Sequence, residues 1–236
     1  MVFLNPIILV SDYDQTLYLN DEDMERNKEN IRKFREKGNK FVIATGRSFL
    51  DFKKKVHLYN FEYDHVILNH GGTILDKNDN IIASYFIDEK IVDDIKNILQ
   101  LQESIKSFCC SELESRVDFT DNNLTKIHVK YNTKEKAMDI TKAIHDKFSN
   151  YVNLYRVSEN TIEIISNRTN KSNAIKLLLD KLHMSKTNVY TIGDGYSDID
   201  MIRQFKGYAM EDSVEELKKY AIEEVKSVSD LIEKIM

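Results

Sequence analysis

The chain has 236 residues, of which 42% are hydrophobic and 31% are charged, and its formal net charge is −5. This composition supports a folded core and excludes an intrinsically disordered protein. The negative balance provides no global positive field that would draw the protein to nucleic acid or to an anionic membrane. An anionic ligand would therefore need local positive charge, from a metal ion or from a few Lys and Arg side chains.

The length indicates one domain with a sizeable insertion. The apolar run at residues 2–10 contains Asn5 and Pro6, is too short to span a bilayer and lacks the basic leader of a signal peptide. The two cysteines, Cys109 and Cys110, are adjacent, and this spacing indicates neither a disulfide framework nor a metal site. We therefore expect a soluble cytoplasmic protein with reduced thiols, with neither a membrane nor a nucleic acid as its partner.

The N-terminal part of the chain alternates short apolar strands with polar helices. The predicted strands are residues 7–10, 41–44 and 66–68, and the predicted helices between them are residues 20–37 and 49–59. Continuous apolar runs of this length are typical of strands that are buried on both faces of a parallel sheet. The alternation predicts an α/β fold with a doubly wound, mostly parallel sheet.

The pattern changes after residue 72. A hairpin signal spans residues 73–83, and it is followed by helices at 87–101 and 133–148 and by strands near 104–110, 116–119, 126–131, 152–157 and 161–165. This mixture predicts an inserted α+β domain at residues 85–166. The catalytic core is then expected to consist of residues 1–84 and 167–236.

The α/β pattern resumes after the insertion. It comprises a helix at 173–182, a strand at 189–192, a helix around 198–205, a short strand at 208–210 and two further helical segments. The single proline and seven glycines argue against flexible linkers between these elements.

Polar side chains follow three of the buried strands. Asp12 and Asp14 follow the first, Thr45 follows the second, and Asp194 with Asp198 follows the strand at 189–192. In an open α/β sheet, ligands bind beyond the carboxyl ends of the strands, so we expect these side chains to converge. Carboxylates that crowd together need a neutralising cation, and oxygen ligands favour Mg²⁺.

This set of groups suggests phosphoryl transfer. Asp12 is placed to act as nucleophile and metal ligand, and Asp14 to give a proton to the leaving oxygen and later activate water. Thr45 is placed to donate a hydrogen bond to a phosphate oxygen. The transferring group needs further positive charge, and Lys171, where the α/β pattern restarts, is the best candidate.

Four segments in this order resemble the motifs of the haloacid dehalogenase-like hydrolases. The segments are Ser11-Asp12-Tyr13-Asp14-Gln15-Thr16-Leu17, Thr45-Gly46-Arg47, Lys171, and Gly193-Asp194-Gly195-Tyr196-Ser197-Asp198. The insertion between the second and third motifs resembles the cap of the Cof-type branch. The segments at residues 69–74 and 207–210 also resemble that branch, so the resemblance covers essentially the whole chain.

The resemblance implies a role for each motif residue. Asp12 is the nucleophile and a metal ligand, and Asp14 is the general acid/base with its backbone carbonyl on the metal. Asp194 is a metal ligand, and Asp198 binds the metal or orients its water shell.

The resemblance also implies a phosphate site. Thr45 and Lys171 hold the phosphate, with Gly46 and Arg47 in the same segment. Two roles stay open for Arg47, which either contacts the substrate phosphate or forms an ion pair across the cleft.

Two positions depart from the family pattern. Gln15 stands where the family usually has Gly, which bears on the backbone angles of the first loop. Ser197 stands where the family usually has Asn, and its shorter side chain reaches less far. Neither change removes a group that performs chemistry.

One predicted strand of the insertion has two different faces. Strand periodicity places Ile127, Val129 and Tyr131 on one face and Lys126, His128 and Lys130 on the other. We expect the apolar face to receive the helices of the insertion. The basic face is either a plain solvated surface or a surface that helps bind an anionic or polyhydroxyl substrate. His70, near the site by sequence order, is expected to be a loop residue.

The sequence thus predicts a Mg²⁺-dependent phosphatase for small phosphomonoesters, sugar phosphates or related metabolites, with an aspartyl-phosphate intermediate and a mobile cap. One alternative is a phosphotransferase or phosphomutase, in which an acceptor hydroxyl replaces water. Another is a non-catalytic signalling or binding module that is phosphorylated on Asp12. The expected partner is a small phosphorylated metabolite, and no oligomeric partner is implied.

Overall fold

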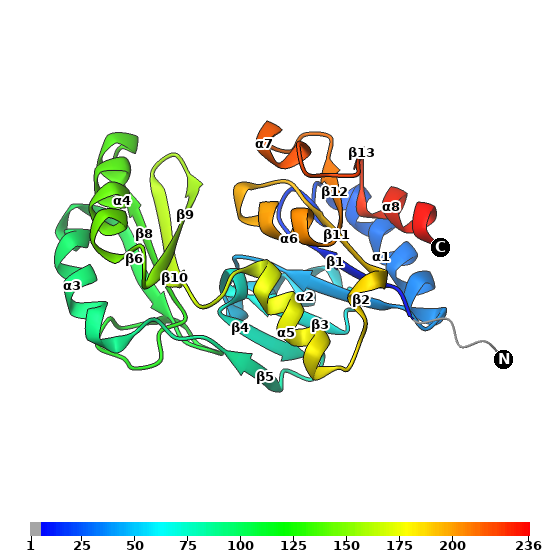
Figure 1. Cartoon of the computed structure of the whole chain (residues 1–236), viewed down its shortest axis with the longest axis horizontal. Helices are drawn as coiled ribbons and strands as arrows, with labels where there is room; N and C mark the ends of the chain where they lie inside the picture. Colours follow the sequence, from blue (N-terminus) through cyan, green and yellow to red (C-terminus); the bar gives the residue numbers. More distant parts are fainter. Residues whose placement is uncertain (1–5) are drawn as a thin grey trace.

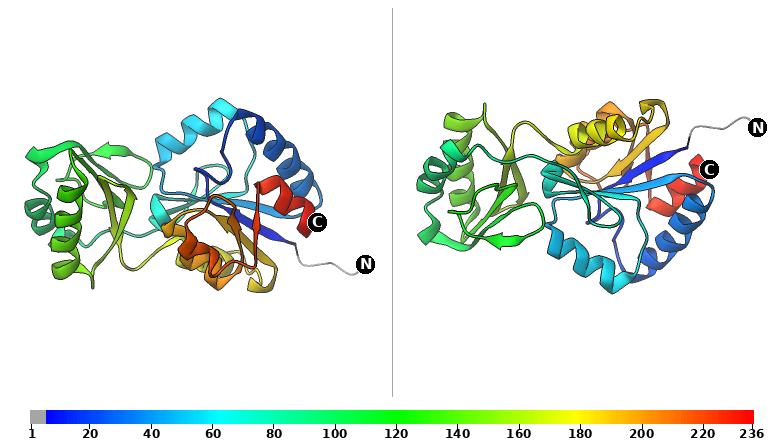
Figure 2. Two further views of the ribbon diagram at one scale, coloured as in Figure 1. Left: turned by 90° about the horizontal axis from the view of Figure 1, so that it is seen from above. Right: turned by 90° about the horizontal axis from the view of Figure 1, so that it is seen from below.

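The computed structural model of the chain describes residues 6–236, which form two lobes joined by two chain segments (Figures 1 and 2). The first residues of the apolar run at 2–10 lie outside the described part. Among residues 6–236, no helix combines the length and the apolar character that a bilayer crossing requires.

The larger lobe is built on an eight-stranded sheet with the order β13-β12-β11-β1-β2-β3-β4-β5. Its strands are β1 (Ile8–Ser11), β2 (Lys40–Ala44), β3 (His65–Leu68), β4 (Thr73–Asp76), β5 (Ile81–Ser84), β11 (Val189–Gly193), β12 (Lys206–Met210) and β13 (Glu223–Val225). Pairing is parallel from β13 to β3, and β4 and β5 add an antiparallel edge. The predicted doubly wound α/β core is confirmed.

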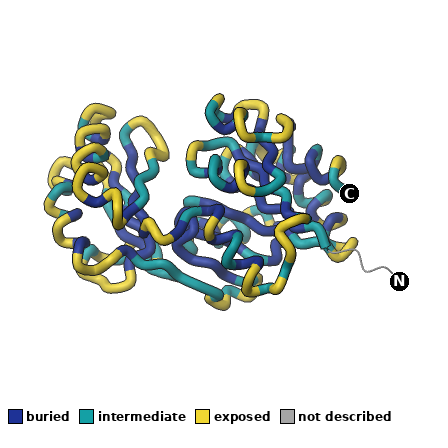
Figure 3. The backbone as a smooth tube through the Cα atoms, in the orientation of Figure 1, coloured by how far each residue is buried: buried dark blue, intermediate teal, exposed yellow. Residues whose placement is uncertain are grey.

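Helices cover both faces of this sheet. One face packs against α1 (Asp21–Glu36), α2 (Phe49–Tyr59) and α8 (Val228–Ile235), and the other against α5 (Lys171–Lys181), α6 (Ile199–Gln204) and α7 (Glu215–Lys218). The central strands are therefore buried on both sides, as Figure 3 shows along the dark tube of the core. This explains why β1 and β2 are continuous apolar runs.

The smaller lobe is an α+β unit with a five-stranded sheet of order β7-β6-β8-β10-β9. Its elements are α3 (Glu89–Leu99), β6 (Ser104–Cys110), β7 (Ser115–Val117), β8 (Lys126–Tyr131), α4 (Lys134–Phe148), β9 (Val152–Ser158) and β10 (Thr161–Ser166). Both helices pack on the outer face of the sheet, and the inner face is turned toward the larger lobe (Figure 1). Ile127, Val129 and Tyr131 lie in the core beneath these helices, as predicted.

Among the differences from the sequence-based expectation, two have a clear local cause. Strand β13 was not predicted, because Glu223–Val225 is mostly charged and only its pairing with β12 at the sheet edge makes it a strand. Helix α5 begins at Lys171, earlier than the expected 173, because the Asn170 side chain accepts a hydrogen bond from the Asn173 N–H and caps the helix. This earlier start places Lys171 in the first turn, at the carboxyl edge of the sheet.

Candidate active site

The polar residues that follow three strands lie together at one edge of the large sheet. β1 lies between β11 and β2, and all three strands run parallel. Asp12, Thr45 and Asp194 directly follow these strands, so the sheet itself brings them together. The expected convergence is therefore observed.

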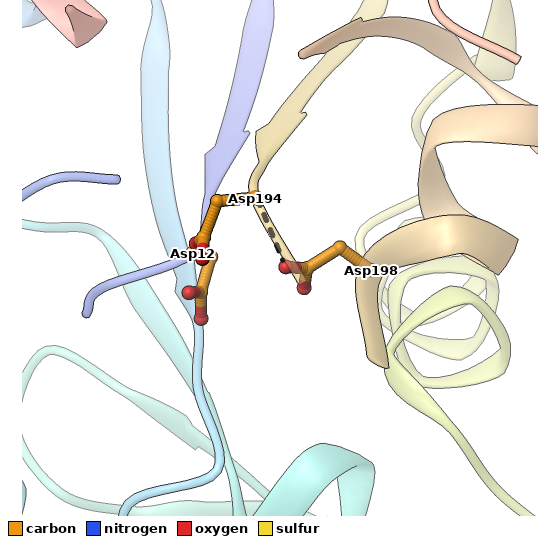
Figure 4. A group of neighbouring side chains, drawn as sticks. All are labelled: Asp12, Asp194 and Asp198. Atoms are coloured by element: carbon orange, nitrogen blue, oxygen red, sulfur yellow. Dashed lines mark hydrogen bonds between the residues drawn. The ribbon is translucent and has the colours of Figure 1, made fainter. Parts of the chain in front are cut away.

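Asp12, Asp194 and Asp198 form an acidic cluster, in which one carboxylate oxygen from each residue lies within 4.8 Å of the other two (Figure 4). Asp198 is held by its own loop, since its Oδ2 accepts hydrogen bonds from the backbone N–H groups of Asp194 at 3.2 Å and Gly195 at 3.1 Å. Asp194 accepts a hydrogen bond from the Thr16 hydroxyl at 2.7 Å. Hydrogen bonds inside the fourth motif, and one between the first and fourth motifs, thus fix the positions of Asp194 and Asp198.

The ammonium of Lys171 lies against the acidic cluster. Its Nζ donates to Oδ1 of Asp12 and to Oδ1 of Asp198, both at 2.6 Å, and the side chain is only 2% exposed. Burial disfavours the charged ammonium, but the two carboxylates overcome this effect and raise the pKa of Lys171. Lys171 therefore remains a cation beside Asp12.

The acidic cluster has more negative charge than Lys171 neutralises. Burial raises the pKa of Asp12 well above its usual value, since the attraction of Lys171 only partly offsets burial and the repulsion from Asp198 and Asp194. Burial and the neighbouring Asp198 also raise the pKa of Asp194. Crowded carboxylate oxygens of this kind fit a hard divalent cation, which would remove the repulsion.

Asp14 lies apart from the acidic cluster and pairs with Arg47. The guanidinium donates from Nε to Oδ2 at 2.8 Å and from Nη2 to Oδ1 at 2.6 Å. Arg47 also lies over the ring of Tyr13, 5.2 Å from its centroid. Of the two roles considered for Arg47, the structure shows the ion pair, and its contact with a substrate phosphate stays a prediction.

The segment around Thr45 packs closely against the ring of His70. Thr45 is buried and its Oγ1 accepts a hydrogen bond from the Arg47 N–H at 3.1 Å. A side chain at Gly46 would place its Cβ 2.4 Å from Cε1 of His70, so only glycine fits this close approach. His70 lies in the short turn Asn69–Gly71 after β3, and it is buried against the segment that contains Gly46.

The two departures from the family pattern lie at the site. Gln15 has φ of +60°, the left-handed conformation that glycine adopts without strain. Gln15 and Ser197 both line the cavity described next.

A cavity of about 1040 Å³ lies between the two lobes. The larger lobe contributes all the predicted catalytic and phosphate-site residues, which are Asp12, Asp14, Thr45, Gly46, Arg47, Lys171, Asp194 and Asp198. The smaller lobe contributes, among others, Phe108, Lys126, His128, Tyr155 and Glu163. The structure thus brings every predicted site residue to one cavity, while their individual roles stay predictions.

Sequence reasoning missed Glu163 and assigned no role to Thr16. Glu163 is a buried carboxylate in the otherwise apolar stretch Ile162–Ile165, and a lone acid in such a strand is a signal that it has a partner. The predicted basic face of β8 is also only partly present at the cavity, because Lys126 and His128 line it whereas Lys130 does not.

Comparisons with known proteins agree with this architecture. A family model described as haloacid dehalogenase-like hydrolase matches residues 9–118 and 110–231. A protein from Buchnera aphidicola, provisionally named a phosphatase, is 27% identical over an alignment of 224 residues, and the match covers 83% of this chain and 82% of that protein. The 5-amino-6-(5-phospho-D-ribitylamino)uracil phosphatase of Bacillus subtilis is 26% identical over an alignment of 207 residues, and the match covers 84% of this chain and 80% of that protein.

The fold also has close counterparts among solved structures. A haloacid dehalogenase-like hydrolase from Bacteroides thetaiotaomicron superposes with a TM-score of 0.83 at 19% identity, covering 98% of this chain and 100% of that one. At this identity the likeness concerns the fold, including the inserted unit.

Proposed function

Since this chain belongs to the haloacid dehalogenase-like hydrolases and is an enzyme of that family, we propose that it is a phosphatase that hydrolyses small phosphomonoesters through an aspartyl-phosphate at Asp12. One observation supports this proposal most directly. Asp12 lies at the tip of the central strand β1, on the cavity, with the Lys171 ammonium 2.6 Å from its Oδ1. A carboxylate nucleophile needs such a cation to bring an anionic phosphate close.

We propose Mg²⁺ as the cofactor. Asp12, Asp194 and Asp198 would hold it, with the backbone carbonyl of Asp14 as the further ligand that the family resemblance implies. When bound, the ion neutralises the carboxylates and the charge of the phosphoryl group. The all-oxygen donor set and the raised pKa of Asp12 support this assignment.

In the proposed reaction, a carboxylate oxygen of Asp12 attacks phosphorus while the bond between phosphorus and the ester oxygen breaks. Asp14, in its protonated form, gives its proton to the departing oxygen. Asp14 then takes a proton from water, the water oxygen attacks the phosphorus of the aspartyl-phosphate, and inorganic phosphate leaves Asp12. Thr45 and Lys171 orient the phosphate oxygens throughout.

The ion pair between Asp14 and Arg47 has a consequence for this reaction. Proton transfer by Asp14 requires the pair to open, because the guanidinium occupies both carboxylate oxygens. The substrate phosphate is a competing partner for Arg47. Substrate binding would thereby release Asp14 for catalysis.

We propose that the substrates are sugar phosphates or related metabolites, and that residues 85–166 form a mobile cap over the core. The cavity between the lobes has the volume of a metabolite site. A relative from Bacillus subtilis bears the name of a phosphatase for a ribitylaminouracil phosphate. Closure of the cap would exclude bulk water from the site. A cytosolic location stays a prediction.

The test is release of inorganic phosphate from p-nitrophenyl phosphate and from a panel of sugar phosphates, with Mg²⁺ and with a chelator. Asp12→Asn is compared with the parent and with Asp139→Asn, a matched change at an exposed position of α4. We expect Mg²⁺-dependent release by the parent and by D139N, and none by D12N. Full release by D12N would refute Asp12 as the nucleophile.

The same samples separate the alternatives. Added polyol acceptors that yield new phosphate esters instead of inorganic phosphate would indicate a phosphotransferase. A phosphorylated Asp12 that persists without release of phosphate would indicate a signalling module. Neither outcome is expected, since Asp14 lines the cavity and would activate water once substrate binding has opened its pair with Arg47.

A further inference from the structure

Four side chains form a row across the inner face of the cap sheet, which we call the cap row. Phe108 on β6 is paired in register with His128 on β8, which is paired with Glu163 on β10, which is paired with Tyr155 on β9. All four side chains line the cavity that contains Asp12. The cap row is therefore the part of the cap that a leaving group would meet.

Glu163 is the centre of the cap row. Its carboxylate is 8% exposed and accepts hydrogen bonds from His128 Nδ1 at 2.8 Å, from Lys126 Nζ at 2.9 Å and from Nε2 of His70, in the core, at 2.6 Å. Burial alone would raise the pKa of Glu163, but Lys126 and the two imidazoles hold it well below its usual value. Glu163 is therefore ionised, and an ionised carboxylate only accepts hydrogen bonds.

The ammonium of Lys126 is already paired with groups of the protein. Its ammonium is 3% exposed and donates to Glu163 and, at 2.6 Å, to the backbone carbonyl of Gly46. Lys126 therefore offers no free positive charge to a second anionic group of the substrate. Other cations of the cap, Lys106 and Arg156, also line the cavity, so binding of an anionic substrate there stays a prediction.

The bonds to Glu163 decide which ring nitrogens are donors. Because Glu163 only accepts, His128 donates from Nδ1 and His70 donates from Nε2. In the neutral rings, Nε2 of His128 and Nδ1 of His70 are then acceptors. Among residues 6–236, neither nitrogen has a hydrogen-bond partner, and Nδ1 of His70 is buried.

Aromatic neighbours hold both rings in place. His128 stacks on Phe108 with ring centroids 4.4 Å apart, and His70 stacks on Tyr155 at 4.6 Å. His128 thus presents a pre-oriented ring at the cavity, whereas the acceptor nitrogen Nδ1 of His70 is buried. A buried acceptor without a partner is costly unless a ligand or water supplies a donor.

We propose that His128, oriented by Glu163, is a specificity-determining residue that accepts a hydrogen bond from a hydroxyl group of the leaving group. This inference rests on the proposed phosphatase function and narrows its substrates to phosphate esters whose leaving group carries hydroxyl groups, as polyols and sugars do. Esters of plain alkyl chains lack hydroxyl donors and would leave this acceptor unpaired.

The experiment compares two esters that differ only in hydroxyl groups, D-glucitol 6-phosphate and n-hexyl phosphate. The measured quantity is the ratio of their kcat/KM values, for the parent and for His128→Phe, His128→Gln and Lys130→Met. The phenylalanine keeps the stack on Phe108 and removes the acceptor, whereas the amide oxygen of glutamine restores one. Lys130 is the matched control, on the same face of β8 but exposed and outside the cavity.

We expect the parent to prefer the glucitol ester about tenfold or more, and H128F to lower that ratio about fivefold. H128Q should retain more of the ratio than H128F, and K130M should retain all of it. A merely structural role of His128 would lower both kcat/KM values together and leave the ratio unchanged, which would overturn the proposal.

Two further outcomes remain decisive. If H128F does not fold, the parent alone decides, because hydrolysis of both esters without a preference for the glucitol ester overturns the proposal. If the parent releases phosphate from neither ester nor from p-nitrophenyl phosphate, the proposed phosphatase function itself fails, and the inference fails with it.

Discussion

Removal of the Lys126 ammonium should destabilise the fold through the charge that it leaves behind. Lys126→Met keeps most of the side-chain volume but removes the ammonium that pairs with buried Glu163. Among the described residues, the other ion-pair partners of Glu163 are the histidines His70 and His128. Breaking a buried ion pair from one side typically costs about 3–5 kcal/mol. The two imidazole donors remain, so we expect a loss of about 3 kcal/mol in the free energy of unfolding.

A second substitution separates the charge from the packing. In Lys126→Met/Glu163→Gln no buried charge is left, and we expect about 2 kcal/mol of the loss to be recovered. The free energies are measured by urea denaturation followed by far-ultraviolet circular dichroism. Lys130→Met, at an exposed position of the same strand, should change the value by less than about 0.5 kcal/mol.

The pH dependence gives an independent check. The partners of Glu163 hold its pKa below the unfolded value, so its contribution is present above about pH 4.3 and is lost as the pH falls through the folded pKa. The gap between the parent and K126M should therefore be full at pH 7 and shrink below about pH 4. A double variant no more stable than K126M, together with a gap independent of pH, would refute the reasoning.

Two other substitutions test contacts in the core. Gly46→Ala places a Cβ 2.4 Å from Cε1 of His70 and should raise KM for phosphate esters about tenfold or more. The double variant Gly46→Ala/His70→Ala should recover part of this loss. A KM of Gly46→Ala equal to that of the parent would contradict this contact. Asp64, which is 8% exposed, accepts hydrogen bonds from Arg35 and the Phe41 N–H, which outweigh burial and lower its pKa. Asp64→Asn should lower the free energy of unfolding by about 1–3 kcal/mol at pH 7. In thermal unfolding, the difference between the parent and this variant should shrink toward pH 3, because the contribution of a carboxylate with a lowered pKa is lost as it protonates. A difference that does not change with pH would contradict this prediction.

The part of the candidate site in the larger lobe was predictable because it depends on chain order and strand direction. Short apolar runs predicted β1, β2 and β11 as buried parallel strands, and residues that follow parallel strands meet at one sheet edge. Asp12, Thr45 and Asp194 were located in this way, and Lys171 followed from the restart of the α/β pattern. These relations are local or topological, so a linear pattern contains them.

The cap half was not predictable, although the faces of β8 were correct. Periodicity placed Lys126 and His128 on the inner face, but it does not report which carboxylate lies opposite them. Glu163 pairs with both and also reaches His70 in the core, far away along the chain. These contacts pair the charge of Lys126 and orient both imidazoles.

The amino-acid sequence by itself determined the α/β core, the inserted α+β unit and the order of the catalytic groups, since hydrophobic periodicity and the polar strand ends encode them. Only the tertiary structure decided that Lys126 is neutralised, that His70 lies beneath Gly46 and that Arg47 holds Asp14. The physical reason is that the charge state and orientation of a buried polar group depend on its partners across the two lobes, and those partners are chosen by packing rather than by sequence neighbours.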